Sequence, residues 1–452
     1  MKASRFNFLV RSPRDPNTTF LYNSFHDNRI VVEDGDVNLR ELFQKVRKHE
    51  SLTEAEDEAA DGLKEMGYLL DDEVDESELF YDWFRNRVTE QNEILTATIL
   101  TTLACNLRCT YCYEKDKLGK SKMTPETMQR VVDWLKARID ATRPAKVNLI
   151  FFGGEPLLNV DAIRKISGDV YPYCKERGIE YTAGMASNGI FLTPKLADEL
   201  KTYGFEWVKI TFDGDRDQHD KKRIYSGGRG TFDQIFNNLE ACAGKLKILL
   251  GGNFDRENAD SFKGLLERIA ASKFKDDIVA TNLKPIMPEM KQHDLNGIGS
   301  SCERCTFSDY EINKMLELRR EIRRVGLTPT DPINVGPCEY YRRNAVTVGI
   351  DGRLFKCIAF LGIEDGQIGD VDHQEYNEVG EAMLSLKPLE HKKCTKCPFV
   401  PLCAGGCRAD SYNQTGSFEN ISCQQPYFIK TLREELPLEY YDGAESATQM
   451  RV

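Results

Sequence analysis

Three cysteines within eight residues form the densest group of reactive side chains in the sequence. The segment reads Cys105-Asn106-Leu107-Arg108-Cys109-Thr110-Tyr111-Cys112 and comes directly after a β-rich stretch. Iron–sulfur clusters take thiolate ligands, and a cubane of four irons normally takes four of them. Three cysteines would therefore leave one iron open to a small molecule. A zinc loop or a set of reduced thiols is the simpler alternative.

A second group of cysteines lies in the last quarter of the chain, and its spacing also suits metal ligands. Cys338 and Cys357 flank a segment that contains Gly352, and the remaining five follow as Cys-x2-Cys-x5-Cys-x3-Cys and one further Cys. These five are Cys394, Cys397, Cys403, Cys407 and Cys423. Zinc ribbons also use paired cysteines, but they rarely need seven at these gaps. The two groups indicate at least two metal sites.

The composition is that of a globular protein with an acidic balance. The 452 residues suffice for two or three domains, with 40% hydrophobic residues and a net charge of −11. That charge disfavours nucleic acid as a binding partner and is compatible with a small molecule or with a basic or neutral peptide. No apolar run approaches the roughly 20 residues that span a bilayer, and no secretory segment is recognisable. We expect a cytoplasmic protein without a membrane partner, whose fourteen cysteines are metal or redox ligands.

The elements that would position the first cysteine group alternate between strand and helix. Strands are expected at Leu95 to Thr102, Lys146 to Phe152, Ile179 to Met185, Trp207 to Phe212, Leu246 to Asn253 and Val279 to Met287. Between them lie helical stretches, one of which starts with the cap Thr124-Pro125. The alternation predicts an α/β fold with a parallel sheet, and six repeats favour a partial (β/α)6 barrel. Reactive residues of such folds gather at the C-terminal ends of the strands.

The segments on either side of this barrel have a different character. Short strands are expected at Phe6 to Val10, Thr18 to Phe25 and Arg29 to Val32, and helices at Leu39 to Lys48 and Thr53 to Glu65. This order predicts a small winged-helix-like module. After a helix from Asp309 to Val325, the chain becomes cysteine-rich and loop-rich and would need metal to be ordered. The expected domains are residues 1–88, 89–310 and 311–452.

Four motifs at successive strand ends resemble those of the radical S-adenosylmethionine (SAM) superfamily. The spacing of the first three cysteines is similar to the motif in which SAM chelates the open fourth iron, so the resemblance gives Cys105, Cys109 and Cys112 a catalytic role. Phe152 to Pro156 resembles the family's glycine motif, and Ser187 to Gly189 a segment near the ribose. Thr211 to Gly214, with the later arginine, resembles the groups that bind the SAM carboxylate. The implied SAM contacts are Tyr111, Gly153, Gly154, Glu155, Ser187, Asn188, Thr211, Asp213 and Arg223.

The resemblance implies one-electron chemistry. A reductant such as flavodoxin or ferredoxin would reduce the cluster, and SAM would be cleaved to methionine and a 5′-deoxyadenosyl radical that abstracts a hydrogen atom. The protein would have to hold the target C–H bond close to that radical and keep water away. A non-enzymatic electron carrier is the alternative without SAM cleavage.

The C-terminal cysteines resemble the SPASM extension, which binds auxiliary four-iron clusters in radical SAM enzymes that act on peptides and proteins. By analogy, an inner cluster takes Cys338, Cys357 and Cys407. An outer cluster takes Cys394, Cys397, Cys403 and Cys423, which makes three [4Fe-4S] clusters in all. Relatives with a fully ligated inner cluster carry another cysteine where this chain reads Glu339 to Asn344. The inner cluster then has an open iron or a donor from elsewhere, such as Cys302 or Cys305, although the simpler interpretation of those two is free loop thiols.

Two reaction classes fit these resemblances. Anaerobic sulfatase-maturing enzymes share both cysteine patterns and form formylglycine, but where they carry an aspartate base this chain has Ile358. Residues 1–88 resemble the element with which peptide maturases capture a precursor's leader, often as an added strand. A stabilising N-terminal cap is the alternative. The chain therefore resembles a maturase of a ribosomally made precursor peptide, of the geopeptide or thioether-forming lineages. In a thioether-forming reaction, a carbon radical on the substrate combines with a cysteine sulfur, and the inner cluster accepts the surplus electron.

Overall fold

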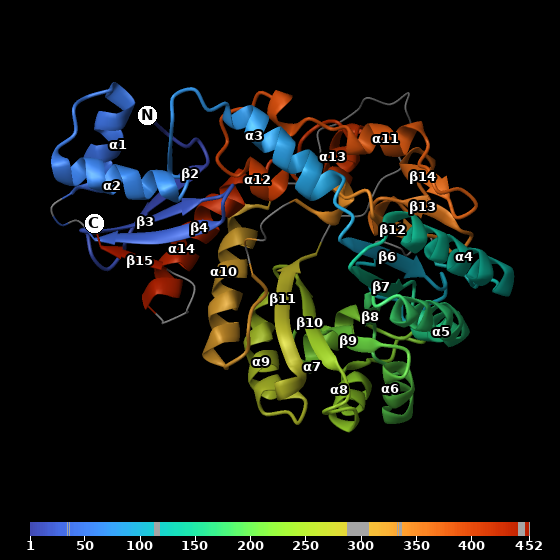
Figure 1. Ribbon diagram of the computed structural model, residues 1–452. Helices are drawn as coiled ribbons and strands as arrows, with labels where there is room; N and C mark the ends of the chain where they lie inside the picture. Colours follow the sequence, from blue (N-terminus) through green and yellow to red (C-terminus); the bar gives the residue numbers. More distant parts are fainter. Residues whose placement is uncertain are drawn as a thin grey trace.

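The structure is a computed structural model that describes residues 1–33, 35, 37–112, 118–286, 307–331, 333, 337–441 and 448–451. Cys302 and Cys305 lie outside these ranges, so their role as donors stays a prediction. Within the described residues, no helix combines the length and apolar character needed to cross a membrane. Figure 1 shows a barrel-like part, a cysteine-rich part beside it, and a smaller N-terminal part.

Six parallel strands form the predicted partial βα barrel, paired in chain order. The strands are β6 (Ile94–Leu100), β7 (Lys146–Phe152), β8 (Glu180–Ser187), β9 (Phe205–Thr211), β10 (Lys247–Phe254) and β11 (Ile278–Pro285). The helices are α4 (Pro125–Thr142), α5 (Val160–Glu176), α6 (Pro194–Lys201), α7 (Arg216–Lys222), α8 (Phe232–Ala241), α9 (Phe262–Ala270) and α10 (Asp309–Arg324). All six predicted strands are confirmed to within two residues at most ends.

Alternation along the strands separates a helix-facing surface from a concave surface. In β7, Val147, Leu149 and Phe151 are fully buried against the helices, while the residues between them face the inside of the barrel. The predicted cap at the start of α4 is present, because the Thr124 hydroxyl accepts a hydrogen bond from the Thr127 N–H at 3.3 Å. The C-terminal strand ends and their loops therefore meet at one edge of the sheet.

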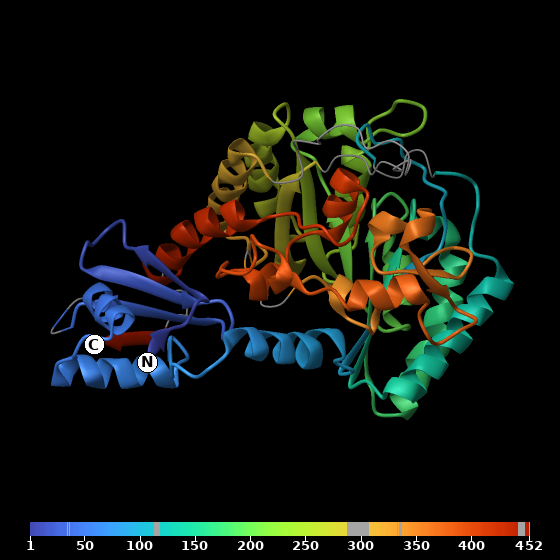
Figure 2. The same ribbon diagram turned by 90° about the horizontal axis from the view of Figure 1, so that it is seen from above.

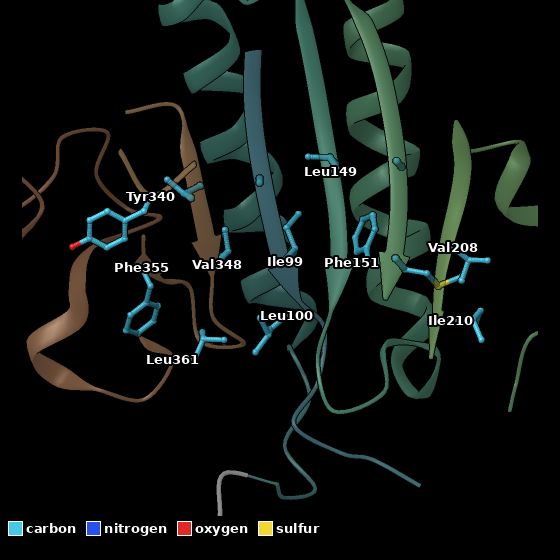
Figure 3. Packing of buried hydrophobic residues seen from close by; sticks show 14 of the residues in the cluster. Ile99, Leu100, Leu149, Phe151, Val208, Ile210, Tyr340, Val348, Phe355 and Leu361 are labelled. Carbon is cyan, nitrogen blue, oxygen red and sulfur yellow. The ribbon is translucent and has the colours of Figure 1, made fainter. Parts of the chain in front are cut away.

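The cysteine-rich part continues the barrel sheet, which the sequence did not predict. Its strands β12 (Ala345–Val348), β13 (Arg353–Phe355) and β14 (Gln367–Asp370) extend the sheet beyond β6. Val348 of β12 pairs in register with Ile99 of β6, and Figure 3 shows the two side chains in one apolar layer. This part also contains α11 (Glu378–Leu384), α12 (Val400–Cys403), α13 (Arg408–Thr415) and α14 (Gln425–Tyr441), so it is more helical than the expected loop-rich tail.

The N-terminal part has the predicted order of strands and helices. Its elements are β1 (Lys2–Ala3), β2 (Asn7–Arg11), β3 (Thr18–Asn23), β4 (Asn28–Glu33), α1 (Leu39–Lys48), α2 (Glu54–Glu65), β5 (Leu69–Leu70) and α3 (Glu76–Trp83), followed by a π-helical turn over Phe84–Thr89. A final strand, β15 (Thr448–Arg451), pairs in parallel with β4, so the sheet order is β15-β4-β3-β2. The outer edge of β4 is thus already paired.

The small sheet is covered on both faces. Leu21, Ile30 and Val32 pack against α1 and α2 on one face. On the other face, Phe20 and Val31 share a core with residues of α12 and α14, and Figure 2 shows α14 alongside this sheet. The N-terminal part is therefore docked onto the C-terminal helix and does not stand apart.

Candidate active site

The first three cysteines lie on the loop that leaves β6 at the C-terminal edge of the barrel. All three side chains are partly exposed. Burial, with smaller contributions from the charges of Glu155, Cys109 and Cys112, raises the pKa of the Cys105 thiol to about 11. The Cys105 sulfur accepts a hydrogen bond from the Leu107 N–H at 3.4 Å. The three predicted thiols are thus brought together, and a metal that binds thiolates would offset their mutual repulsion.

Gly153 and Gly154 let the loop after β7 run against the cysteine loop. The Gly154 N–H donates to the Thr102 carbonyl at 3.0 Å, and the Glu155 N–H donates to the Ala104 carbonyl at 2.8 Å. A Cβ at Gly153, whose φ is +152°, would lie 2.5 Å from the Thr102 oxygen. A Cβ at Gly154 would lie 2.4 Å from the Ala104 oxygen. The glycines are therefore required for this close approach.

Glu155 joins the ends of the second and third barrel strands. Its fully buried carboxylate accepts hydrogen bonds from the Ser187 hydroxyl at 2.8 Å and the Asn188 N–H at 2.7 Å. The Asn188 side chain in turn donates to Asn106 Oδ1 of the cysteine loop at 2.8 Å. Burial raises the pKa of Glu155, and the Asn188 and Ser187 donors counteract that rise. The three predicted residues form one network that anchors the cysteine loop.

Tyr111, Asp213 and Arg223 meet in a second buried network. The Tyr111 hydroxyl donates to Asp213 and accepts from Arg223 Nη1 at 3.0 Å. Asn253 completes this network, because its side chain donates to the Tyr111 hydroxyl at 3.1 Å and its N–H donates to Asp213 at 2.8 Å. Burial raises the pKa of Asp213, whereas the nearby Arg223 guanidinium lowers it. The Arg223 Nε is buried without a protein partner in the described part of the chain, so this arginine keeps a donor for a ligand.

Two further residues of this site, Asn253 and His219, received no role from the sequence. Asn253 is the last residue of a predicted strand and belongs to no recognised motif. The one signal in the sequence that could have identified it is its position at the end of the strand that follows Asp213. His219 is fully buried, and its Nδ1 accepts the Asp213 N–H at 3.3 Å. Burial lowers the pKa of His219 well below its usual value, so the ring is neutral and holds the loop after β9 in place.

The seven C-terminal cysteines separate into the two predicted sets by their mutual electrostatic influence. Burial raises the pKa of Cys357 to about 12, and the thiolates of Cys338 and Cys407 add to that rise. Burial likewise raises the pKa of Cys403 to about 12, and here the added charges are those of Cys397, Cys394 and Cys423. The structure therefore brings together the same inner three and outer four residues that the sequence assigned to two clusters.

A recurring hydrogen bond prepares many of these sulfurs for an anionic role. The Cys338 sulfur accepts the N–H of Tyr340, two residues further on, at 3.5 Å, as Cys105 does with Leu107. Burial raises the pKa of four further thiols, and in each of them a backbone N–H two residues further on opposes that rise. These are Cys357, Cys397, Cys403 and Cys407. Donors of this kind stabilise thiolates and tune iron–sulfur clusters.

The residues present fit iron–sulfur clusters better than a single metal ion. Among the described residues, no group of His, Cys, Asp and Glu is arranged around one ion, and none of the twelve cysteines there forms a disulfide. A four-iron cubane is itself larger than an ion, so its thiolates stand further apart. The inner set has three thiols, and the segment after Cys338 supplies Tyr340 and Tyr341, both buried, as neighbours. The three thiols of the inner set would leave the fourth iron of an inner cluster without a thiol ligand from this set.

Comparison with known proteins places the barrel in a described family. Residues 99–269 match the radical SAM superfamily. A cysteine-type anaerobic sulfatase-maturating enzyme of Clostridium novyi is 22% identical over 354 residues, which are 73% of this chain and 92% of that protein. An AdoMet-dependent heme synthase of Nitratidesulfovibrio vulgaris is 26% identical over 352 residues, which are 70% and 87% of the two chains.

Two solved structures resemble this fold over most of the chain. The sulfatase-maturating enzyme anSMEcpe, solved with AdoMet and a Cp18Cys peptide, has a TM-score of 0.55 at 17% identity and covers 77% of this chain and 97% of its own. SuiB of Streptococcus suis, bound to its precursor peptide SuiA, has a TM-score of 0.51 at 14% identity and covers 93% of this chain and 98% of its own. At these identities the likeness establishes the fold alone.

Proposed function

Because the chain is a radical SAM superfamily enzyme, we propose that it matures a ribosomally made precursor peptide by installing a thioether or a similar crosslink. The observation that carries this proposal is the extent of the fold match. The likeness to SuiB spans the N-terminal part as well as the barrel, whereas the likeness to anSMEcpe stops at 77% of the chain. A domain beyond the barrel suits a substrate that must be captured by a leader.

The cysteine sets supply the redox centres that this function needs. Cys105, Cys109 and Cys112 would hold the SAM-binding cluster, and the inner and outer sets would hold two auxiliary clusters. When bound, the cluster and SAM supply a 5′-deoxyadenosyl radical that abstracts hydrogen. An inner set of three thiols leaves a coordination position for a substrate sulfur, a soft ligand suited to iron.

The residues of the two buried networks would position SAM. Arg223 would offer its unpaired Nε to the SAM carboxylate, and Thr211 at the end of β9 would offer its hydroxyl. Tyr111, fixed through its hydroxyl, presents its ring to the adenine. Ser187 and Asn188 would lie near the ribose, and the Gly153-Gly154 backbone would approach the amino group. The buried Asp213 keeps Arg223 charged and oriented.

Formylglycine formation is the second candidate, and one residue favours keeping it. Ile358 replaces the aspartate that follows the inner cysteine in sulfatase-maturing enzymes. Asp410, however, is buried three residues after Cys407, and burial raises its pKa to about 6. A carboxyl group with that pKa accepts a proton readily near neutral pH.

The test uses anaerobically reconstituted protein. We expect Mössbauer spectra of four-iron clusters and formation of 5′-deoxyadenosine from SAM under dithionite. When Cys105, Cys109 and Cys112 become alanine, deoxyadenosine formation should be lost, while the cluster signal should fall only by the share of the SAM-binding cluster. With a precursor peptide encoded beside this gene, each crosslink should remove two hydrogens from the peptide mass. Replacement of a sulfur by oxygen would identify formylglycine chemistry instead, and absence of deoxyadenosine would overturn both.

A further inference from the structure

Two lysines project from barrel strands toward the concave side of the sheet. In β9, Val208 and Ile210 are buried against the helices, so Lys209 between them faces the inside of the barrel together with Thr211. In β11, Leu283 and Pro285 are buried, and Lys284 between them faces the same side. Both lysines are thus placed on the surface that borders the candidate active site.

Lys209 extends across β10 toward β11. Gly251 of β10 lies in register between Thr211 of β9 and Asn282 of β11. A Cβ built on Gly251 would lie 3.4 Å from Lys209 Cε and 3.3 Å from the Thr211 hydroxyl. Because Gly251 has no side chain, the lysine chain has room to pass over the strand. The charge of Lys284 is close enough to lower the pKa of Lys209, so the two ammonium groups repel one another.

Lys284 lies between the SAM network and the inner cysteine set. It pairs in register with Asn253, which donates to the Tyr111 hydroxyl. On its other side, the thiolate charge of Cys407 is close enough to raise the pKa of Lys284, although burial has the larger effect and lowers it. The Lys284 side chain is exposed, so it is accessible to a ligand.

Neither lysine has a carboxylate partner among the described residues. Other lysines of the barrel do: Lys222 pairs with Asp255 at 2.5 Å, and Lys247 lies 3.7 Å from Glu206. Burial lowers the pKa of both Lys209 and Lys284, and the charge of Lys284 lowers the pKa of Lys209 further. Two like charges side by side in a partly desolvated space are unfavourable without an anion. Their placement is explained if an anionic group enters the barrel with the substrate.

We propose that Lys209 and Lys284 bind a carboxylate of the peptide substrate and hold it between the SAM site and the inner cysteine set. The inference rests on the proposed function and adds a substrate class to it, namely peptides with a carboxylate near the residue to be modified. An ammonium group and a carboxylate form a charge-assisted hydrogen bond, which is stronger when water is largely excluded. A glutamate or aspartate side chain and a free C-terminus offer the same chemistry.

The test compares three short peptides on the reconstituted holoenzyme with SAM present. The first is the end-capped pentapeptide Gly-Ser-Glu-Ser-Gly, the second carries Gln in place of Glu, and the third is the Gln peptide with a free C-terminus. Titration calorimetry should give at least about tenfold tighter binding for one of the carboxylate peptides than for the capped Gln peptide. Whichever carboxylate peptide is preferred identifies the source, and equal binding of all three overturns the inference.

Variants assign the preference to the two lysines. In K209M and K284M the preference should disappear, and in K209R it should persist because the charge remains. K247M is the matched control, a lysine of the same sheet that already has an acidic neighbour, and it should keep the full preference. If K284M abolishes SAM binding, the lysines serve SAM itself and the inference is wrong. Absent SAM cleavage by the wild-type protein would overturn the proposed function, whereas cleavage without carboxylate preference overturns only this inference.

Discussion

At the scale of single residues, Tyr111 is where the cysteine loop meets the ends of two barrel strands. Its hydroxyl contacts Asp213, Arg223 and Asn253 at once, so each of the three constrains the other two. Arg223 also offsets the charge of Asp213, whose carboxylate is fully buried. The network is thereby ordered before any ligand binds.

Replacing Arg223 by lysine tests this network. Lysine keeps the charge but cannot reach the Tyr111 hydroxyl and a ligand carboxylate with the same planar fork. We expect SAM affinity, measured by equilibrium dialysis, to fall by about tenfold or more in R223K. Arg216 on α7 pairs with Asp233 at the surface, so R216K is the control and should bind SAM as the wild type does. Equal affinities in both variants would contradict the assigned role of Arg223.

His219 makes stability depend on pH. Its pKa in the folded protein lies well below the ordinary value of about 6.5, so below that pH the unfolded chain binds a proton that the folded chain does not. The free energy of unfolding should therefore fall as pH drops below about 6.5, with up to about 1.4 kcal/mol per pH unit from this residue. Urea unfolding between about pH 7 and pH 5 should show a shallower slope for H219Q than for wild type or for H373Q, since His373 is exposed. Parallel slopes in all three would refute this role.

At the scale of elements, the barrel was predictable because its signals are local. Strands such as Lys146 to Phe152 can be recognised by their runs of apolar residues, and a chemically distinctive motif follows each of the first four barrel strands. The additional strands β12 to β14 were not predicted, because they are only three or four residues long and join the barrel sheet through β12, which pairs with β6 some 250 residues earlier in the chain. Helix α14 was missed because Pro437 lies within it. Asn253 was missed for a related reason, since its role depends on a neighbouring strand.

Gly153 shows how an element fixes the site. G153A would place a Cβ 2.5 Å from the Thr102 carbonyl and force an unfavourable φ, so the loop after β7 would have to move away from the cysteine loop. We expect a loss of about 1–3 kcal/mol in the free energy of unfolding and weaker SAM binding. The control is G264A in α9, where a Cβ meets nothing within 4 Å and alanine should stabilise by about 0.5–1 kcal/mol. A stable G153A protein with unchanged SAM binding would show that the two loops do not depend on this contact.

At the scale of the whole molecule, the N-terminal part and the C-terminal helix hold one another. Phe20 and Val31 pack with Phe399 and Phe428, and Arg29 pairs with Glu439 at 2.8 Å. Deleting residues 1–88 would expose this shared core, so loss of activity after such a deletion would report instability as much as loss of leader binding. A sharper test of the leader-binding proposal leaves the core intact and changes only the sheet edge.

That edge is the outer side of β4, where β15 pairs in parallel from Ile30 to Glu33. If the leader binds by adding a strand here, it must displace β15, and the chain's own C-terminal strand competes with it. A protein that ends at Tyr441 should therefore bind the leader about threefold tighter or more, measured by fluorescence anisotropy with a labelled leader peptide.

Point variants separate this competition from a general effect of shortening the chain. M450P removes a backbone donor from β15 and should mimic the truncation, whereas M450A keeps the ladder and should behave as wild type. Unfolding monitored by circular dichroism should be nearly unchanged in all of these, because α14 and its contacts with Phe20 remain. Leader affinity that stays the same after loss of β15 would mean that the leader binds elsewhere and that the β4 edge serves only to tie the two ends of the chain together.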